Sequence, residues 1–333
     1  MSTTILRTVD TWWVDTCVGA ARIETDATSL RELLADPEKI HASRSSTDTV
    51  DPVTLELVSP VTAPCRVVAQ MTNYASHVKD TGLKPDTIPL TFFRKTSGSI
   101  TGPYDDIVCP DHVHFLDYEV EVGVVIGREL PVGTQVTPDN WATFVAGLVV
   151  TNDVSARDVQ LPKTQFFESK SYPTFTPVGP ALVLLDESEL KRFGDLRLRL
   201  WVNGEIRQDA LVDADMIYSP LEALRALSRF QRLDPGDLLL TGTPVGTALS
   251  APAKPAQIVA ALLPAETKWK MFFKRQAQNP KYLKDGDVVE VTIGTDDGAI
   301  DLGRQRTTVR GTPSITVSPL PGGVTGGLVG GRT

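Results

Sequence analysis

Residues 115–127 read FLDYEVEVGVVIG, a run rich in β-branched residues that carries two glutamates two positions apart. Side chains alternate between the two faces of a β-strand, so Glu119 and Glu121 share one face of the predicted strand, opposite Tyr118, Val120 and Val122. Because buried carboxylates must be paired or bind a metal, a hard divalent cation is one partner for this pair. The alternative is a half-exposed strand whose glutamates face water, as charged side chains usually do.

The composition of the 333-residue chain is that of an ordinary globular protein, with 41% hydrophobic and 22% charged residues. Its net charge of −8 argues against a nucleic-acid-binding surface and a polybasic membrane patch, whereas a small anionic substrate needs only local positive charge. Cys17, Cys65 and Cys109 lack the spacing of a zinc site or a disulfide framework. No apolar run reaches the length of a membrane span, so we expect a soluble cytoplasmic protein that binds neither nucleic acid nor membrane.

A short helix is predicted between residues 73 and 82. On it Tyr74, His77 and Asp80 fall at i, i+3 and i+6 along one face, and Gly82 ends it. A carboxylate one turn from a histidine fixes the imidazole tautomer and raises its basicity, which is what a general base requires. The alternative is an ordinary surface pair of a histidine and an aspartate.

A third carboxylate and a lysine follow further along the chain. The apolar run Trp141–Val150 leads into a loop that begins at Thr151 and carries Asp153, a position where functional side chains often lie. Three acidic side chains with waters completing an octahedron suit Mg²⁺ or Mn²⁺. Lys170 lies in a segment stiffened by three prolines, where it would counter the carboxylates and neutralise a developing enolate. The alternative is a surface lysine.

Other signals concern structure more than chemistry. The alternation at residues 53–58 predicts a strand, and Asn203-Gly204 predicts a two-residue hairpin turn after the strand Leu196–Val202. A capping box of Ser219 and Glu222 opens a core-facing helix. Small residues at 241–246 let the backbone approach a ligand closely.

These stretches together resemble the fumarylacetoacetate hydrolase family over about residues 66–310. Each motif is weak alone, but their order and spacing make the combination specific. The motifs are Asn73-Tyr74-x-x-His77-x-x-Asp80, Asp117-Tyr118-Glu119-x-Glu121, Asn152-Asp153-Val154-Ser155-Ala156-Arg157-Asp158-x-Gln160, Lys170 and Thr241-Gly242-Thr243-Pro244-x-Gly246.

The resemblance implies an α+β fold, a mixed β-roll of the fumarylacetoacetate hydrolase C-terminal-domain type with a small N-terminal α+β segment, and a homodimer. It implies Mg²⁺ or Mn²⁺, with Ca²⁺ as an alternative in crystals, held by Glu119, Glu121 and Asp153. It also implies a catalytic His77 with its partner Asp80, and a Lys170 that stabilises an enolate. Substrate contacts are expected from Tyr74, Gln160 and Thr243.

The expected organisation is a small segment at 1–64, a catalytic domain at 65–312 and a Gly-rich flexible tail at 313–333. Three features depart from the family pattern: Asp80 stands where glutamate is usual, Pro173 replaces a position that is often acidic, and residues 248–282 form an insertion. The insertion contains the apolar stretch Ile258–Leu263 and is expected to cap the site or form an oligomer contact, because extra segments at a site mouth are commonly functional.

The predicted function is that of a metal-dependent hydrolase that cleaves a carbon–carbon bond in a β-diketone or an acylpyruvate-like 2-oxo acid. His77 and Asp80 would activate water, and the metal with Lys170 would stabilise the enolate that is released. Two alternatives within the family are an oxaloacetate-like decarboxylase and a 2-hydroxydienoate isomerase. A third alternative is a non-catalytic protein that binds a metal or a metabolite.

Overall fold

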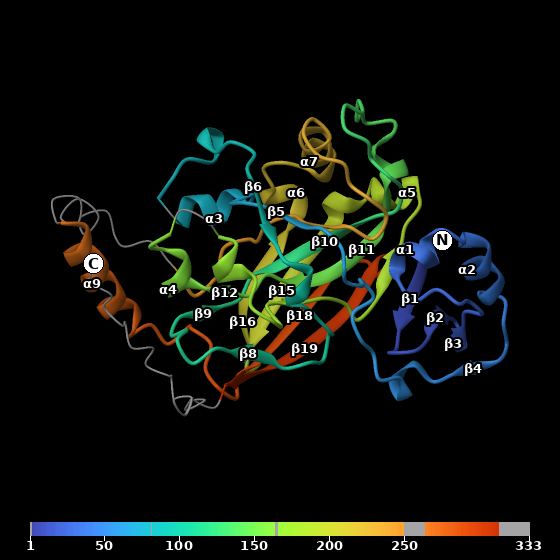
Figure 1. Ribbon diagram of the computed structural model, residues 1–333, viewed down its shortest axis with the longest axis horizontal. Helices are drawn as coiled ribbons and strands as arrows, with labels where there is room; N and C mark the ends of the chain where they lie inside the picture. The colour runs from blue at the N-terminus through green and yellow to red at the C-terminus, as the bar shows by residue number, and fades with distance from the viewer. Residues whose placement is uncertain (1, 81, 164–165, 250–263, 313–333) are drawn as a thin grey trace, which may run out of the picture.

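The computed structural model of the chain describes residues 2–80, 82–163, 166–249 and 264–312 (Figure 1). The predicted flexible tail at 313–333 and the apolar stretch Ile258–Leu263 of the insertion lie outside these ranges. Among the described residues, no helix combines the length and the apolar character that a membrane span requires.

The larger sheet has ten strands in the order β4-β3-β2-β1-β14-β11-β10-β17-β5-β6. Its strand β10 (Val120–Ile126) is buried at every position and pairs antiparallel with β11 (Val145–Asn152) and β17 (Leu238–Leu240). The segment at 115–127 therefore forms the interior of the fold. The remaining strands of this sheet are β1 (Thr3–Arg7), β2 (Trp12–Thr16), β3 (Gly19–Arg22), β4 (Thr49–Val50), β5 (Val67–Gln70), β6 (Phe92–Lys95) and β14 (Leu182–Leu184).

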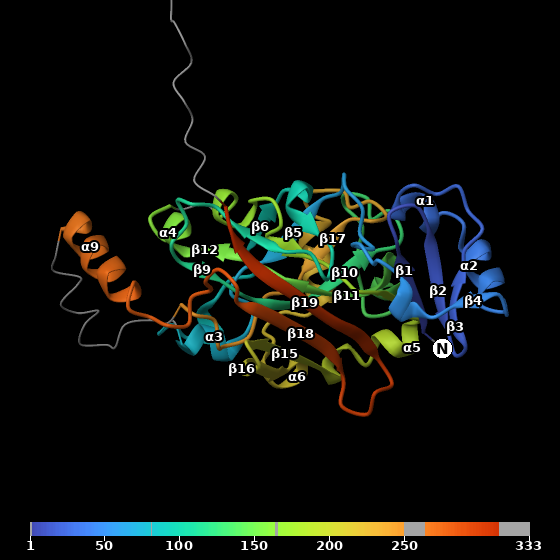
Figure 2. The ribbon, with the colours of Figure 1, turned by 90° about the horizontal axis from the view of Figure 1, so that it is seen from below.

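A second sheet of five strands, in the order β16-β15-β18-β19-β8, packs across the first (Figure 2). Val120, Val122 and Val124 of β10 share one core cluster with Val291 and Ile293 of the second sheet, so alternate residues of β10 fill the space between the sheets. The strands of the second sheet are β8 (Ile107–Cys109), β15 (Leu196–Val202), β16 (Glu205–Leu211), β18 (Val288–Thr295) and β19 (Asp301–Gly311). Two short pairs complete the described strands: β9 (Leu116–Asp117) with β12 (Ser155–Ala156), and β7 (Ile100–Thr101) with β13 (Thr176–Pro177).

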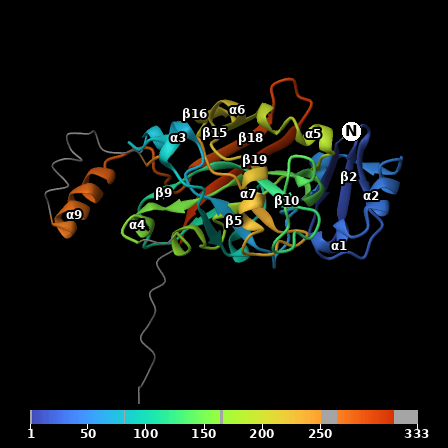
Figure 3. The ribbon, with the colours of Figure 1, turned by 90° about the horizontal axis from the view of Figure 1, so that it is seen from above.

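The helices are short and lie around the sheets (Figure 3). The capping box predicted at Ser219 is confirmed. The Ser219 side chain accepts from the backbone N–H of Glu222, and the Glu222 side chain accepts from the backbone N–H of Ser219. The α-helices are α1 (Leu30–Leu34), α2 (Pro37–Ser43), α3 (Ala75–Asp80), α4 (Arg157–Gln160), α5 (Glu187–Leu190), α6 (Val212–Asp215), α7 (Pro220–Leu227) and α9 (Ala265–Gln276). Single 3₁₀ turns are η1 (Pro52–Thr54), η2 (Pro85–Thr87), η3 (Ser97–Ser99), η4 (Trp141–Phe144), η5 (Glu168–Lys170) and η6 (Phe193–Asp195).

Of two further local predictions, the hairpin turn is confirmed and the strand is wrong. The hairpin at Asn203-Gly204 is confirmed, and both residues have positive φ angles of 52° and 79°, as the tight turn between β15 and β16 requires. The strand predicted at residues 53–58 is wrong. Pro52 opens the turn η1 there, and the Asp51 side chain accepts from the backbone N–H of Val53, so local capping replaces a strand ladder.

The N-terminal segment is continuous with the main sheet, because β1 pairs antiparallel with β14. Both large sheets are mixed and open among the described strands. The predicted α+β class is therefore confirmed, and the narrower term β-roll stays a prediction.

Gly147 lies in β11 where the strand passes close to its neighbour β14. A Cβ atom at this position would lie 2.0 Å from the carbonyl oxygen of Val183, which belongs to the backbone and cannot turn away. We expect Gly147→Ala to lower the free energy of unfolding by about 2 kcal/mol or more, at the upper end of overpacking costs. Urea denaturation measures this. Gly98→Ala is the control because its added Cβ meets nothing within 3.4 Å; equal losses in both variants would contradict the prediction.

Candidate active site

The three carboxylates predicted as metal ligands come together at one end of β10. Glu119 precedes β10, Glu121 lies on it, and Asp153 follows the neighbouring strand β11. The backbone N–H of Asp153 donates to the carbonyl of Glu119 at 2.8 Å, which fixes the two strand ends side by side. One oxygen of each carboxylate lies within 4.8 Å of the others, and all three residues are buried. The exposed-strand alternative for the two glutamates is wrong.

Two lysines neutralise part of this charge. Lys170 donates from Nζ to Glu119 Oε2 at 2.5 Å and to Asp153 Oδ2 at 2.6 Å. Lys95, on β6, donates to Asp153 Oδ1 at 2.5 Å and to the carbonyl of Phe175 at 2.7 Å. Lys170 is thus a buried lysine that faces the carboxylates, as predicted. Lys95 was missed, and its only sequence signal is an inward position on a four-residue strand.

Arg157 supplies the third buried cation of the site. Its Nε donates to Asp117 Oδ2 at 2.8 Å and its Nη1 to Gln160 Oε1 at 2.8 Å, while Nη2 donates to Glu119 Oε1. The guanidinium therefore holds one side of Glu119 while Lys170 holds the other.

Asp117 is a fourth buried carboxylate that sequence analysis did not assign. It accepts from the backbone N–H of Ala248 at 2.7 Å and of Leu249 at 3.0 Å, in addition to Arg157. Because Ala248 and Leu249 are the first residues of the insertion, Asp117 ties the start of the insertion to the carboxylate cluster.

The two glutamates differ in electrostatic surroundings. Burial would raise the pKa of Glu119, but the ammonium of Lys170 and the guanidinium of Arg157 lower it to about 2. Burial raises the pKa of Glu121 well above its ordinary value, and the carboxylates of Asp153 and Glu119 raise it further. The ammonium of Lys170 lowers the pKa of Glu121 in part, as does the backbone N–H of Gly242, which donates to Glu121 Oε2 at 2.7 Å. Gly242 has a φ of 85°, and a side chain there would collide with Asn73, so glycine is required.

The donor set fits a hard divalent cation. Three converging carboxylates suit Mg²⁺ or Mn²⁺, and among the described residues no cation donates a hydrogen bond to Glu121. Glu119, Glu121 and Asp153 are therefore the residues that would hold such an ion.

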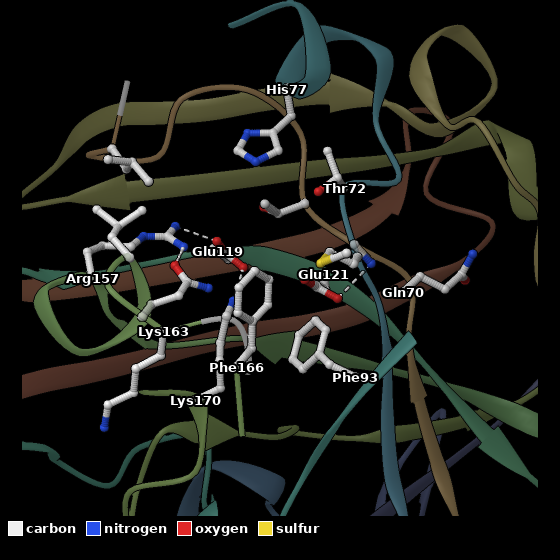
Figure 4. A pocket seen from close by; sticks show the side chains of 16 residues that line it. Gln70, Thr72, His77, Phe93, Glu119, Glu121, Arg157, Lys163, Phe166 and Lys170 are labelled. Carbon is white, nitrogen blue, oxygen red and sulfur yellow. Dashed lines mark hydrogen bonds and ion pairs between the residues drawn. The ribbon is translucent and has the colours of Figure 1, made fainter. Parts of the chain in front are cut away.

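A cavity of about 220 Å³ opens above the glutamates (Figure 4). Predicted residues that line it are His77, Gln160, Lys170 and Thr243, together with Glu119 and Glu121. Thr243 Oγ1 accepts from Gln208 Nε2 at 2.9 Å. The other lining residues are Gln70, Met71, Thr72, Phe93, Arg157, Leu161, Lys163, Phe166, Gly242 and Leu249.

The structure separates the three residues predicted on one face of α3. His77 points into the cavity, with its Nδ1 buried and without a hydrogen-bond partner (Figure 4). Asp80 is exposed at the end of the helix, so the structure does not join it to His77. Tyr74 is fully buried in the core and is not among the residues that line the cavity, and its predicted substrate contact stays a prediction.

Helix α3 is held in place by the neighbouring helix α6. Asp215 accepts from the backbone N–H of Ser76 at 2.6 Å and also from its hydroxyl. The same hydroxyl accepts from the backbone N–H of Val245 at 3.2 Å. A six-residue helix is not stable alone, so these bonds position His77 over the cavity.

The described part of the insertion packs beside the site. Phe273 of α9 stacks on Phe115 at 5.7 Å between ring centroids, and Asn279 donates to the carbonyl of Ala248 at 2.8 Å. Figures 1 and 2 show α9 at the margin of the molecule, beyond β9. Its predicted roles as a cap or an oligomer contact stay predictions.

The fold and the site define an α+β protein with a buried carboxylate centre suited to a divalent cation. Residues 66–310 match the model of the fumarylacetoacetate (FAA) hydrolase C-terminal family, so the chain belongs to this family. The family resemblance seen in the motifs is thereby confirmed.

Two relatives illustrate the range of similarity. Oxaloacetate tautomerase Fahd2a, mitochondrial, of Rattus norvegicus is 38% identical over 193 residues, which cover 58% of this chain and 59% of the relative. An uncharacterized protein of Staphylococcus aureus (strain USA300) is 32% identical over 242 residues, or 72% of this chain and 69% of that protein. The chain thus spans about 59% of the length of the tautomerase.

Solved structures of enzymes share the fold. A probable 2-hydroxyhepta-2,4-diene-1,7-dioate isomerase from Mycobacterium abscessus has a TM-score of 0.71 at 29% identity, over 94% of this chain and all of that one. Fumarylacetoacetate hydrolase from Exiguobacterium antarcticum has a TM-score of 0.66 at 27% identity, over the same shares. The similar proteins include tautomerases, isomerases and hydrolases, which supports an enzyme.

Glu121 provides a direct test of the cation site. We expect Glu121→Gln to lower Mn²⁺ affinity at least tenfold, since even outer-shell partners of metal ligands contribute about 10–100-fold. Because the raised pKa of Glu121 favours its protonated form, wild-type affinity should rise with pH as that proton is displaced. Isothermal titration calorimetry at several pH values measures both effects. Glu205→Gln, at an exposed side chain, is the control; unchanged affinity in Glu121→Gln would contradict the assignment.

Proposed function

We propose that this chain is a divalent-cation-dependent enzyme that interconverts the keto and enol forms of a 2-oxo acid. The observation that carries the proposal is the placement of His77 across the cavity from Glu119 and Lys170, with a buried Nδ1 that has no hydrogen-bond partner among the described residues. Moving a proton between carbon and oxygen needs one base and one stabilised enolate but no activated water. The 38% identity to an oxaloacetate tautomerase supports the same chemistry.

Glu119, Glu121 and Asp153 would hold Mg²⁺ or Mn²⁺ in this proposal. When bound, such an ion supplies Lewis-acid polarisation of the substrate oxygens. Arg157 keeps Glu119 oriented and holds Gln160 at the cavity wall. The residues of the chain thereby bind the 2-oxo acid end of the substrate in one orientation.

The proton moves between the substrate and two side chains. Burial lowers the pKa of His77, which keeps its imidazole neutral near pH 7 and able to take a proton from C3 of the substrate. Burial would also lower the pKa of Lys170, but the carboxylates of Asp153 and Glu119 raise it. Its ammonium therefore stays charged and donates a hydrogen bond to the enolate oxygen, and the proton that His77 takes from C3 is passed to that oxygen to give the enol.

Hydrolysis of a carbon–carbon bond is the second candidate function. It is favoured by the likeness to a solved fumarylacetoacetate hydrolase and by the position of His77 at the cavity. Tautomerisation is preferred because water activation was predicted from a His77–Asp80 pair, and these two side chains are not joined. Decarboxylation would use the same enolate stabilisation. It is distinguished from tautomerisation because it releases carbon dioxide.

Two broader expectations remain proposals, namely a homodimer and a cytoplasmic location. Cys17, Cys65 and Cys109 are all free thiols, which fits a reducing compartment. Relatives such as the rat tautomerase carry the word mitochondrial in their names, so the compartment needs its own localisation experiment.

The decisive experiment follows C3 hydrogen–deuterium exchange by NMR. Metal-stripped protein is compared with protein reloaded with Mg²⁺ or Mn²⁺, using several 2-oxo acids and acylpyruvates, and the products are identified. Metal-dependent exchange with the carbon skeleton intact supports the tautomerase. Release of two carbon fragments supports the hydrolase, and release of carbon dioxide the decarboxylase. Absence of exchange and of products for every compound would contradict all three and leave the non-catalytic alternative.

Substitutions on α3 separate the two leading functions. We expect His77→Ala to slow exchange by about 10²-fold or more, the contribution of a general base, while Mn²⁺ affinity measured by titration stays unchanged. Asp80→Ala is the matched variant on the same helix. Because Asp80 is exposed, its variant should exchange at close to the wild-type rate. Equal losses in both variants would show that the two side chains act as a pair and would favour hydrolysis.

A further inference from the structure

The cations that face the carboxylate end of the cavity are already engaged there. Arg157 donates to Asp117, Glu119 and Gln160. Lys170 donates to Glu119 and Asp153, which belong to the carboxylate cluster that would hold the cation. These two positive groups therefore serve the reacting end of a substrate.

One further cation lines the described cavity wall, and it faces elsewhere. The side chain of Lys163 is 50% exposed and pairs with Glu168, which is 52% exposed. Figure 4 shows its ammonium turned away from the cavity. An exposed lysine that already has a carboxylate partner contributes little to binding a second carboxylate.

Five apolar side chains also line the described wall. Phe93 and Phe166 meet edge to face with ring centroids 5.6 Å apart, and Figure 4 shows both rings on the side of the cavity opposite His77. Met71, Leu161 and Leu249 extend this surface. All five side chains are half-buried, so a bound substrate would cover apolar area that water now contacts.

The polar groups on this wall are neutral. Thr72 carries a hydroxyl. The amide of Gln70 donates from Nε2 to the carbonyl of Tyr218 at 3.2 Å, and Figure 4 shows it turned away from the cavity. Neither group supplies a charge that would pair with a carboxylate.

We propose that the substrate of this site is a 2-oxo acid whose C3 substituent is uncharged and apolar, an alkyl or aryl group, in place of a second carboxylate. The inference rests on the proposed function and adds its substrate class. The reaction breaks a C3–H bond and forms an O–H bond at the C2 oxygen, with no net change in protons or electrons. A distal carboxylate would lose its hydration against the Phe93–Phe166 wall, and the lining cations that the structure describes already have carboxylate partners.

The test compares 2-oxo acids that differ only at C3. Phenylpyruvate and 4-methyl-2-oxopentanoate carry apolar groups where oxaloacetate carries a carboxylate. With the Mg²⁺-loaded protein, we expect kcat/KM for C3 hydrogen–deuterium exchange to favour at least one apolar compound over oxaloacetate by about tenfold or more, the factor that 1.4 kcal/mol produces. A preference for oxaloacetate over both apolar compounds would overturn the inference.

A substitution on the apolar wall should reverse the expected preference for apolar compounds over oxaloacetate. Phe166→Arg places a cation on the apolar wall and should raise kcat/KM for oxaloacetate while lowering it for phenylpyruvate. Phe167→Arg is the matched control, because Phe167 is the next residue, is 52% exposed and does not line the cavity. Equal changes in the two variants, or no gain for oxaloacetate in Phe166→Arg, would count against the wall as the determinant of specificity.

A binding measurement tests the substrate class independently of the tautomerase proposal. The non-reacting analogues 3-phenyllactate and malate differ in the same way at C3 and are titrated into the Mg²⁺-loaded wild-type protein by calorimetry. Tighter binding of 3-phenyllactate supports the substrate class even if no compound exchanges, a result that would overturn the tautomerase proposal alone. Tighter binding of malate would overturn the substrate class whatever the reaction proves to be.

Discussion

The bond from Lys170 to Glu119 and Asp153 is the interaction on which the site depends. Removing an ion from water costs several kcal/mol even in relaxed proteins, so buried charges persist only when they are paired. Around this lysine, Asp117, Glu119 and Asp153 each receive a donated bond from at least one cation. Glu121 receives none, and the carboxylates beside it raise its pKa. The cluster is thus one cation short, which is why a divalent ion is its natural complement.

The sheet register supplies the precision that this pairing needs. Val120 of β10 stands opposite Asn152 of β11, so the strand ends deliver Glu119 and Asp153 to the same place. A slip of one residue would turn every side chain of β10 to the other face and scatter the carboxylates. The valines that fill the core between the sheets hold this register, so the apolar pattern of the segment at 115–127 fixes the position of its charges.

The local sequence pattern predicts part of the site. The rest depends on contacts between residues that lie far apart in the sequence. Strand alternation places Glu119 and Glu121 on one face, and turn chemistry fixes Asn203-Gly204, because both effects act within a few residues. Lys95 reaches Asp153 across 58 positions, a pairing with no local signature. Both His77 and Asp80 lie on the predicted helix, now α3. Tertiary packing gives them different surroundings, because His77 lines the cavity and Asp80 is exposed.

The cavity wall has a charged part and an apolar part, which differ in how their residues are held. The charged half is built from the ends of interior strands, where each carboxylate is tied to several partners and a substitution would leave buried charges unpaired. The apolar half comes from the edge strand β6, which carries Phe93, and from loop residues such as Phe166 and Leu249. Side chains at an edge or in a loop have few partners, so they change without disturbing the core. An arrangement of this kind allows the apolar residues to change while the carboxylate centre stays intact, and this is why we propose that Phe93 and Phe166 determine which substrate is bound.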